Sequence, residues 1–374
     1  MVFRTANRAK LHWTSENATA VKRFPFLDWM RGLAVVVMIQ CHAFNAFARL
    51  DTRDGGPYVL SQFVGGMAAP LFLFMAGMTT AFQIESLARR EASPWRRWTA
   101  ALRRAGYILA IALLFRFTNW VGSYPGGSVQ ELTKVDILNC MAVALAVFAA
   151  AAAFSAEGRL RFALLGAAAV AMLSPVMANL PWDGVPPLLR EYLVPGAGRG
   201  RFPFFPCASY VGFGIAAGLA VKRAAESRMD RMMQWFVLIA FALIFTNQYF
   251  SNLPYSIYPK SNFWTDSPAL IFIRTGIILA LLAGSYLWTE YGARPVWSWM
   301  QTLGKASLLV YWVHVVIVYG GWTKYFRRNM SIPQTALATA LLTAMMVGLA
   351  AARLWWSARR AARQPKRVPA VLQT

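Results

Sequence analysis

Residues 27–45 read LDWMRGLAVVVMIQCHAFN, an apolar run in which Asp28 and Arg31 are the only Asp, Glu, Lys or Arg side chains. A run of about 17–25 apolar residues is long enough to cross the hydrocarbon core of a membrane as one α-helix. Nine further segments of this kind follow, so the sequence predicts an all-α integral membrane protein with about ten transmembrane helices in one bundle. The predicted segments cover residues 27–49, 59–86, 99–119, 135–155, 160–179, 205–221, 233–249, 268–289, 297–320 and 333–356.

The composition supports this fold class. Of the 374 residues, 57% are hydrophobic and 14% are charged, whereas soluble domains typically have about 45–50% apolar and about 25% charged residues. This balance excludes a disordered chain and disfavours a soluble globular enzyme. We expect a basic tail over 1–26, a multi-span transmembrane domain over 27–356 and a second basic tail over 357–374.

The basic residues predict the orientation of the chain. There are 38 Lys and Arg against 15 Asp and Glu, a formal net charge of +23. Most of these basic residues fall in the two tails and in alternate loops, and Lys and Arg accumulate in cytoplasmic loops. Both termini are therefore predicted to be cytoplasmic, in what we expect to be a bacterial inner (cytoplasmic) membrane. The excess charge is assigned to orientation and to anionic membrane lipids, and no nucleic-acid partner is expected.

The first span carries two ionisable groups on one stripe. Arg31 and His42 are eleven residues apart, which at 100° per residue is three turns plus about 20°, with a separation of about 16 Å along the helix axis. Asp28 lies three residues before Arg31 and is placed to pair with it. Ionisable groups inside a membrane are expensive and are functional hypotheses by default. The alternative for His42 is a structural histidine that hydrogen bonds to a neighbouring helix.

The fourth predicted span opens with Asp136 and Asn139, which share one face of the helix. They would orient an acceptor hydroxyl or the second ring nitrogen of His42. The alternative is that Asp136 caps the N-terminus of its helix. Arg116 and Arg274 lie near the outer ends of their spans, where each either pairs with Asp136 or extends towards the membrane surface.

Two further features belong to the predicted outer side. His314, in the ninth span, either lines the same cavity as His42 or makes a hydrogen bond between helices. The loops at 181–206 and 249–268 are rich in Pro, Gly and aromatic residues. They are either stiff connections or a lid whose rings stack on sugars. No metal site is predicted, because the three His and three Cys show no ligand spacing.

The Arg31-x10-His42 pattern, in a first span that opens Leu-Asp-x-x-Arg-Gly-Leu-Ala, resembles the type 3 membrane acyltransferase family. It is most similar to the relatives around the heparan-α-glucosaminide N-acetyltransferases. Other stretches fit in order: GGMAAPLFLFMAG at 65–77, VDILN at 135–139 and LGKASLLVYWVH at 303–314. The resemblance implies transfer of an acyl group, usually acetyl, from cytoplasmic acyl-CoA to a hydroxyl or amine of a glycan or lipid-linked sugar at the outer face. It assigns functional roles to Arg31 and His42.

Acyl transfer from a thioester requires few catalytic side chains. A neutral His42 suffices as general base, since the thiolate of CoA leaves without much acid help; alternatively, His42 accepts the acyl group itself before passing it on. Candidates for the phosphates of acetyl-CoA are the basic residues near the inner face. They are Arg31 (with its neighbour Asp28), Arg103, Arg104 and Lys305. The alternative for these charges is orientation and lipid contact.

Two other function classes share some of these features. Intramembrane Arg, Asp and His also mark substrate and proton pathways, so a transporter or flippase of a sugar-containing substrate is the main alternative. A scaffold subunit is the third. An inner pocket for CoA with Arg31 at its phosphate end would distinguish the acyltransferase from both. The oligomeric state is not predicted.

Overall fold

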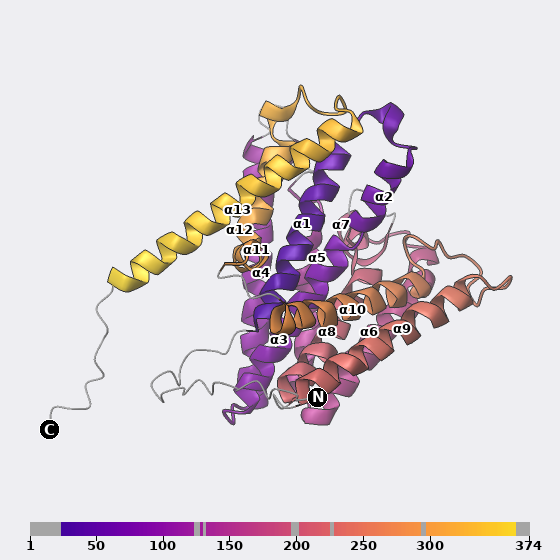
Figure 1. The fold of residues 1–374 in the computed structure, drawn as a ribbon. Coiled ribbons are helices and arrows are strands. Elements are labelled where there is room, and N and C mark those ends of the chain that lie inside the picture. The colour runs from indigo at the N-terminus through magenta and orange to yellow at the C-terminus, as the bar shows by residue number, and fades with distance from the viewer. Residues whose placement is uncertain are drawn as a thin grey trace, which may run out of the picture.

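The computed structural model describes residues 24–122, 128–129, 132–195, 202–224, 228–292 and 297–363, and the regular elements in this part of the chain are all helices (Figure 1). The α-helices are α1 (Pro25–Phe47), α2 (Gly56–Gly65), α3 (Ala68–Ala88), α4 (Pro94–Gly122), α5 (Ile137–Phe148), α6 (Ala156–Asn179), α7 (Pro187–Leu193), α8 (Phe204–Arg223), α9 (Met229–Ser251), α10 (Pro268–Tyr291), α11 (Trp299–Lys305), α12 (Ser307–Tyr319) and α13 (Ile332–Arg363). Short 3₁₀ helices are η2 (Leu50–Thr52), η4 (Ala149–Ala153) and η6 (Gly321–Thr323). The all-α membrane fold is confirmed.

The number of straight spans is smaller than the sequence predicts. Among the described residues, eight helical segments are long and apolar enough to cross a membrane. A ninth is the pair α11 and α12, which bends by 88° at Ala306. The predicted span at 135–155 is the shorter α5 followed by η4. All ten predicted segments are therefore helical, but an apolar run carries no signal for a bend inside the membrane.

Helix α1 holds one half of the bundle together. It packs against α2, α3, α10, α11, α12 and α13, and Figure 1 shows it (indigo) in the middle of these elements. Its contact with α11 is unusually close. A Cβ on Gly32 would lie 1.9 Å from the Met300 carbonyl oxygen, and one on Gly304 would lie 1.8 Å from the Asp28 carbonyl oxygen. The two glycines let the backbones touch beside Arg31.

The other half of the bundle is built on α8. Helix α3 packs along α8, α6 packs on its other side, and α9 pairs with α10. Large buried side chains such as Phe74, Phe148 and Ile215 fill this core. Helix α13, yellow in Figure 1, crosses α1 and then extends away from the bundle towards Arg363.

The loop after α12 is tied back to the end of α1. The backbone N–H of Arg328 donates to the Ala46 carbonyl, at 3.0 Å, and the N–H of Met330 donates to the Phe47 carbonyl, at 2.9 Å. This loop therefore lies beside the last turn of α1, the turn that follows His42.

Candidate active site

Two cavities lie along one side of α1. The first, of about 450 Å³, is lined by Arg31 and Met38 of this helix. The second, of about 690 Å³, is lined by its His42 and Asn45. Tyr311 of α12 borders both cavities. One stripe of α1 thus passes from the first cavity to the second, with Tyr311 between them.

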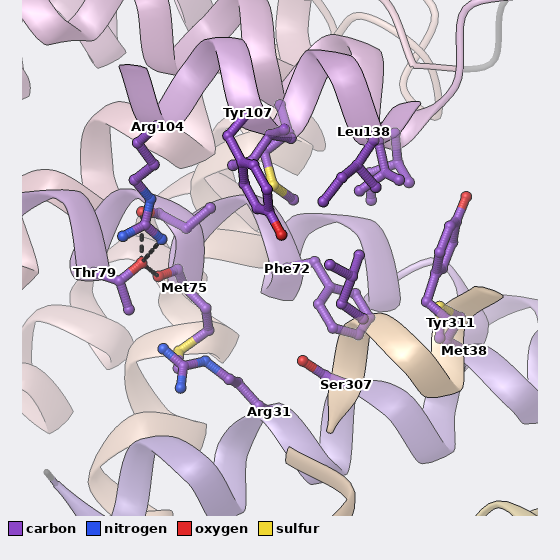
Figure 2. A pocket seen from close by; sticks show the side chains of 16 residues that line it. Arg31, Met38, Phe72, Met75, Thr79, Arg104, Tyr107, Leu138, Ser307 and Tyr311 are labelled. Carbon is purple, nitrogen blue, oxygen red and sulfur yellow. Dashed lines mark hydrogen bonds between the residues drawn. The ribbon is translucent and has the colours of Figure 1, made fainter. Parts of the chain in front are cut away.

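The first cavity has two cations at one end and an apolar remainder. Arg31 forms an ion pair with Asp28 at 3.0 Å, as the spacing in the sequence predicts. Arg104 of α4 donates to the hydroxyl of Thr79 on α3. In Figure 2 the two guanidinium groups lie at one end of the view and Tyr311 lies at the other. The other walls include Met75, Ile108, Ile111, Leu138 and Met141.

Arg103 and Lys305 lie elsewhere. Consecutive residues of an α-helix point about 100° apart. Arg103 therefore lies on the exposed face of α4, and of the two only Arg104 lines the cavity. Lys305 is exposed at the end of α11, where the chain bends. Of the four basic candidates for CoA, the structure brings Arg31 and Arg104 into one cavity.

His42 and His314 form a hydrogen-bonded pair beside the second cavity. Their rings stack with centroids 5.1 Å apart, and Nδ1 of His42 lies 2.9 Å from Nε2 of His314. Nδ1 of His314 lies 2.7 Å from the Val310 carbonyl oxygen. That oxygen can only accept, so His314 carries its proton on Nδ1. Neutral His314 then accepts from Nδ1–H of His42, and the lone pair of a neutral His42 is on Nε2.

Asp136 both caps α5 and pairs with Arg116. Its carboxylate accepts from the N–H groups of Leu138 and Asn139, at 3.0 and 3.1 Å. It also lies 3.1 Å from a guanidinium nitrogen of Arg116. Asp136 therefore caps its helix, and Nδ1 of His42 meets His314 and not Asp136 or Asn139. Asn139 is buried and donates to the Lys134 carbonyl; it does not line the second cavity. Arg274 reaches Tyr210 instead of Asp136.

Comparison with known protein families identifies the family of this chain. Residues 24–353 match the acyltransferase domain of the type 3 family. The chain belongs to the type 3 acyltransferase family. No curated protein gives a significant match. The matched region runs from the residue before α1 well into α13, so the membrane bundle is itself the acyltransferase domain. The closer likeness to the heparan-α-glucosaminide N-acetyltransferases stays a prediction.

The first of the two predicted lid loops approaches the second cavity, and the other borders a smaller cavity. Helix α7 lies in the first loop, and burial raises the pKa of its Tyr192, with the Asp136 carboxylate adding to the effect. Phe202, from the same loop, lines the second cavity and also a smaller one of about 170 Å³. Trp264 of the other loop borders that smaller cavity. Part of the first loop, 196–201, lies outside the described residues.

Some residues of the candidate site carry little signal in the sequence. Tyr311 separates the cavities and packs edge-on against His314, with centroids 5.9 Å apart. Its position three residues before His314 indicates that the two side chains lie on the same side of one helix. Arg327 and Arg328 line the second cavity, but as two basic residues in a loop between helices they carry no signal of their own in the sequence. In the described part of the chain, no group of three or more His, Cys, Asp or Glu is arranged to hold a metal ion.

We expect Asp136→Ala to lower the free energy of unfolding by about 3–5 kcal/mol, because it leaves the nearly buried Arg116 without its counter-charge and α5 without its cap. Asp136→Asn keeps a good capping side chain, so its loss should be smaller by about 1 kcal/mol. Denaturant unfolding of the purified variants measures both. Equal losses would show that the cap contributes nothing.

Proposed function

We propose that this membrane acyltransferase moves an acetyl or other short acyl group from cytoplasmic acyl-CoA to a hydroxyl or amine of a glycan or lipid-linked sugar at the opposite face. The observation that carries the proposal is the stripe of α1 that passes both cavities. Arg31 of this stripe is joined by Arg104 of α4 at the first cavity, and His42 is joined by His314 of α12 beside the second. A donor and an acceptor entering from opposite ends would therefore meet near Tyr311.

The first cavity fits the donor. Arg31 and Arg104 supply guanidinium groups, which bind phosphate oxygens strongly and often in pairs. The apolar walls beyond them suit the acyl group and the methylene groups of the pantetheine arm. Arg104 is held by a neutral hydroxyl, that of Thr79, so its charge is not neutralised by that contact. The thioester would then lie towards Tyr311 and the histidines.

The histidine pair fits the transfer step. As general base, Nε2 of His42 takes the proton of the acceptor hydroxyl or amine while the acceptor oxygen or nitrogen attacks the thioester carbonyl carbon. The carbon–sulfur bond breaks, the CoA thiolate leaves and takes up a proton, and the acyl group ends on the acceptor. His314 orients His42 and stabilises its protonated form. In the alternative route the same lone pair first accepts the acyl group.

The charges of the second cavity bear on the acceptor. Lys134, Arg116, Arg327 and Arg328 line it, and Asp136, which pairs with Arg116, is the one acidic residue among the described lining residues. A cavity with this positive surplus attracts anions. We therefore propose an acceptor that carries a phosphate or a carboxylate, as a phosphate-linked lipid sugar does.

The test uses the purified protein in lipid nanodiscs with isotopically labelled acetyl-CoA, and membranes from cells that lack the protein as the source of acceptor. Mass spectrometry of the glycans should find the label as an acyl ester or amide. Comparing cell-envelope glycans with and without the protein then identifies the acceptor. Movement of a glycan across the membrane of sealed proteoliposomes without any acyl donor, and no labelled product in nanodiscs, would contradict the proposal and favour a flippase.

We expect Arg104→Gln to raise the KM for acyl-CoA by about 10- to 100-fold, the value of one charge-assisted hydrogen bond. Arg103→Gln is the matched control, since the neighbouring Arg103 lies on the exposed face of the same helix and should leave KM unchanged. Initial rates against acyl-CoA concentration measure both. Equal effects of the two substitutions would remove the first cavity as the donor site.

A further inference from the structure

A cluster of arginines lies where α3 and α8 end and α4 and α6 begin. Glu85, in the last turn of α3, accepts from Arg223 of α8 through both oxygens, at 3.4 and 3.3 Å. The same carboxylate lies 3.5 Å from Arg159 in the first turns of α6. Arg97 of α4 lies close enough to repel the charge of Arg159. None of these four residues lines the two cavities of the proposed active site.

The cluster has more cations than its carboxylate satisfies. Two guanidinium groups contact Glu85, and a third, that of Arg97, lies near Arg159. The side chain of Arg159 is only 5% exposed. Nε and Nη1 of Arg159 and Nε of Arg97 are buried without a hydrogen-bond partner in the described structure. A buried charged donor without a partner is strongly unfavourable. The arrangement is therefore complete only with a further anion.

We propose that Arg97, Arg159 and Arg223 bind a phosphate group. Phosphate matches the planar fork of guanidinium donors and supplies negative charge to a cluster of three arginines and one carboxylate. The first turn of α6 contributes the positive end of a helix close to Arg159, with Ser155 as its cap. The histidine pair of the proposed active site lies outside this cluster, so we assign the cluster binding and no catalytic step.

Two ligands carry phosphate to this place. The helix ends put the cluster at an end of the bundle, where a membrane supplies anionic phospholipid headgroups. The other source is CoA. Glu85 is six residues beyond Thr79 on α3 and Arg97 is seven before Arg104 on α4. These spacings place the cluster about 9–11 Å along the helices from the arginine end of the first cavity. The lipid source is independent of the proposed function, and the CoA source rests on it.

The test is Arg97→Gln, with the adjacent and exposed Arg96→Gln as its matched control. Arg97 forms no ion pair with the described residues. If the cluster is purely structural, Arg97→Gln removes a charge that the other arginines repel, and the fold is unharmed. If the cluster binds phosphate, the same substitution removes a contact to the ligand, and the affinity for phosphate should fall about 10- to 100-fold. Two probes are titrated in nanodiscs: phosphatidylglycerol in a neutral lipid background, and CoA compared with dephospho-CoA, which lacks the 3′-phosphate.

A fall confined to phosphatidylglycerol assigns the site to lipid. A fall for CoA that is absent for dephospho-CoA assigns it to the nucleotide 3′-phosphate. Glu85→Gln gives a change of opposite sign: removal of the competing carboxylate should tighten the same probe and increase the thermal stabilisation that it produces. Unchanged affinities for both probes in Arg97→Gln and Arg159→Lys would overturn the inference. So would a weaker response in Glu85→Gln, provided that the variant is folded by circular dichroism.

Discussion

His42→Ala is expected to lower the rate of acyl transfer by about 10²- to 10⁴-fold, the contribution of a well-placed general base, and to leave acyl-CoA binding unchanged. The reason is the hydrogen-bond chain from Val310 through His314, which directs the lone pair of His42 to Nε2. The measurement is single-turnover transfer of labelled acetyl from acetyl-CoA to membranes lacking the protein. Full activity in a folded His42→Ala variant would remove His42 from the mechanism.

His314 provides the control for this interpretation. Gln at position 314 still presents an acceptor to Nδ1–H of His42, whereas Ala does not. We therefore expect His314→Gln to retain more activity than His314→Ala, with both losses smaller than that of His42→Ala. Incubation with labelled acetyl-CoA without an acceptor, followed by mass spectrometry, separates the two routes. A label on His42 supports the acyl carrier, and its absence together with full transfer supports the general base.

Gly32→Ala is expected to destabilise the protein by at least about 1–3 kcal/mol, the usual cost of forcing extra volume into a packed interface. The new Cβ would lie 1.9 Å from the Met300 carbonyl oxygen of the chain beside it, and backbone cannot turn away as a flexible side chain can. Helices α1 and α11 must then separate. Arg31, the residue before Gly32, moves with the helix, so we also expect a weaker affinity for acyl-CoA.

The matched control is Gly284→Ala in α10, where no atom lies within 4 Å of the added Cβ. Alanine favours helix over glycine by up to about 1 kcal/mol, so this variant should be as stable as the parent or more stable. Thermal unfolding in detergent and the dissociation constant for acyl-CoA measure both variants. If Gly32→Ala were as stable as Gly284→Ala, the close approach of α1 and α11 would be wrong.

Local patterns in the chain predicted the first span well. The pairing of Asp28 with Arg31 and the alignment of Arg31 with His42 follow from helix geometry alone, because residues three and eleven apart share a side of an α-helix whatever surrounds it. The spacing on α4 likewise separates Arg103 from Arg104. It does not say which of the two faces the cavity, because the same helix could present either residue to the cavity by rotating about its axis.

The sequence by itself determined that this is an α-helical membrane protein, since apolar length and composition decide where a chain is stable, and its motifs indicated the acyltransferase family. Only the tertiary structure decided the partners. His42 meets His314, which is 272 residues away in the chain. Glu85 is joined by arginines from two other helices, and the ninth span bends at Ala306 where α11 packs on α1. Each depends on contacts between distant segments, which residue spacing within one helix cannot encode.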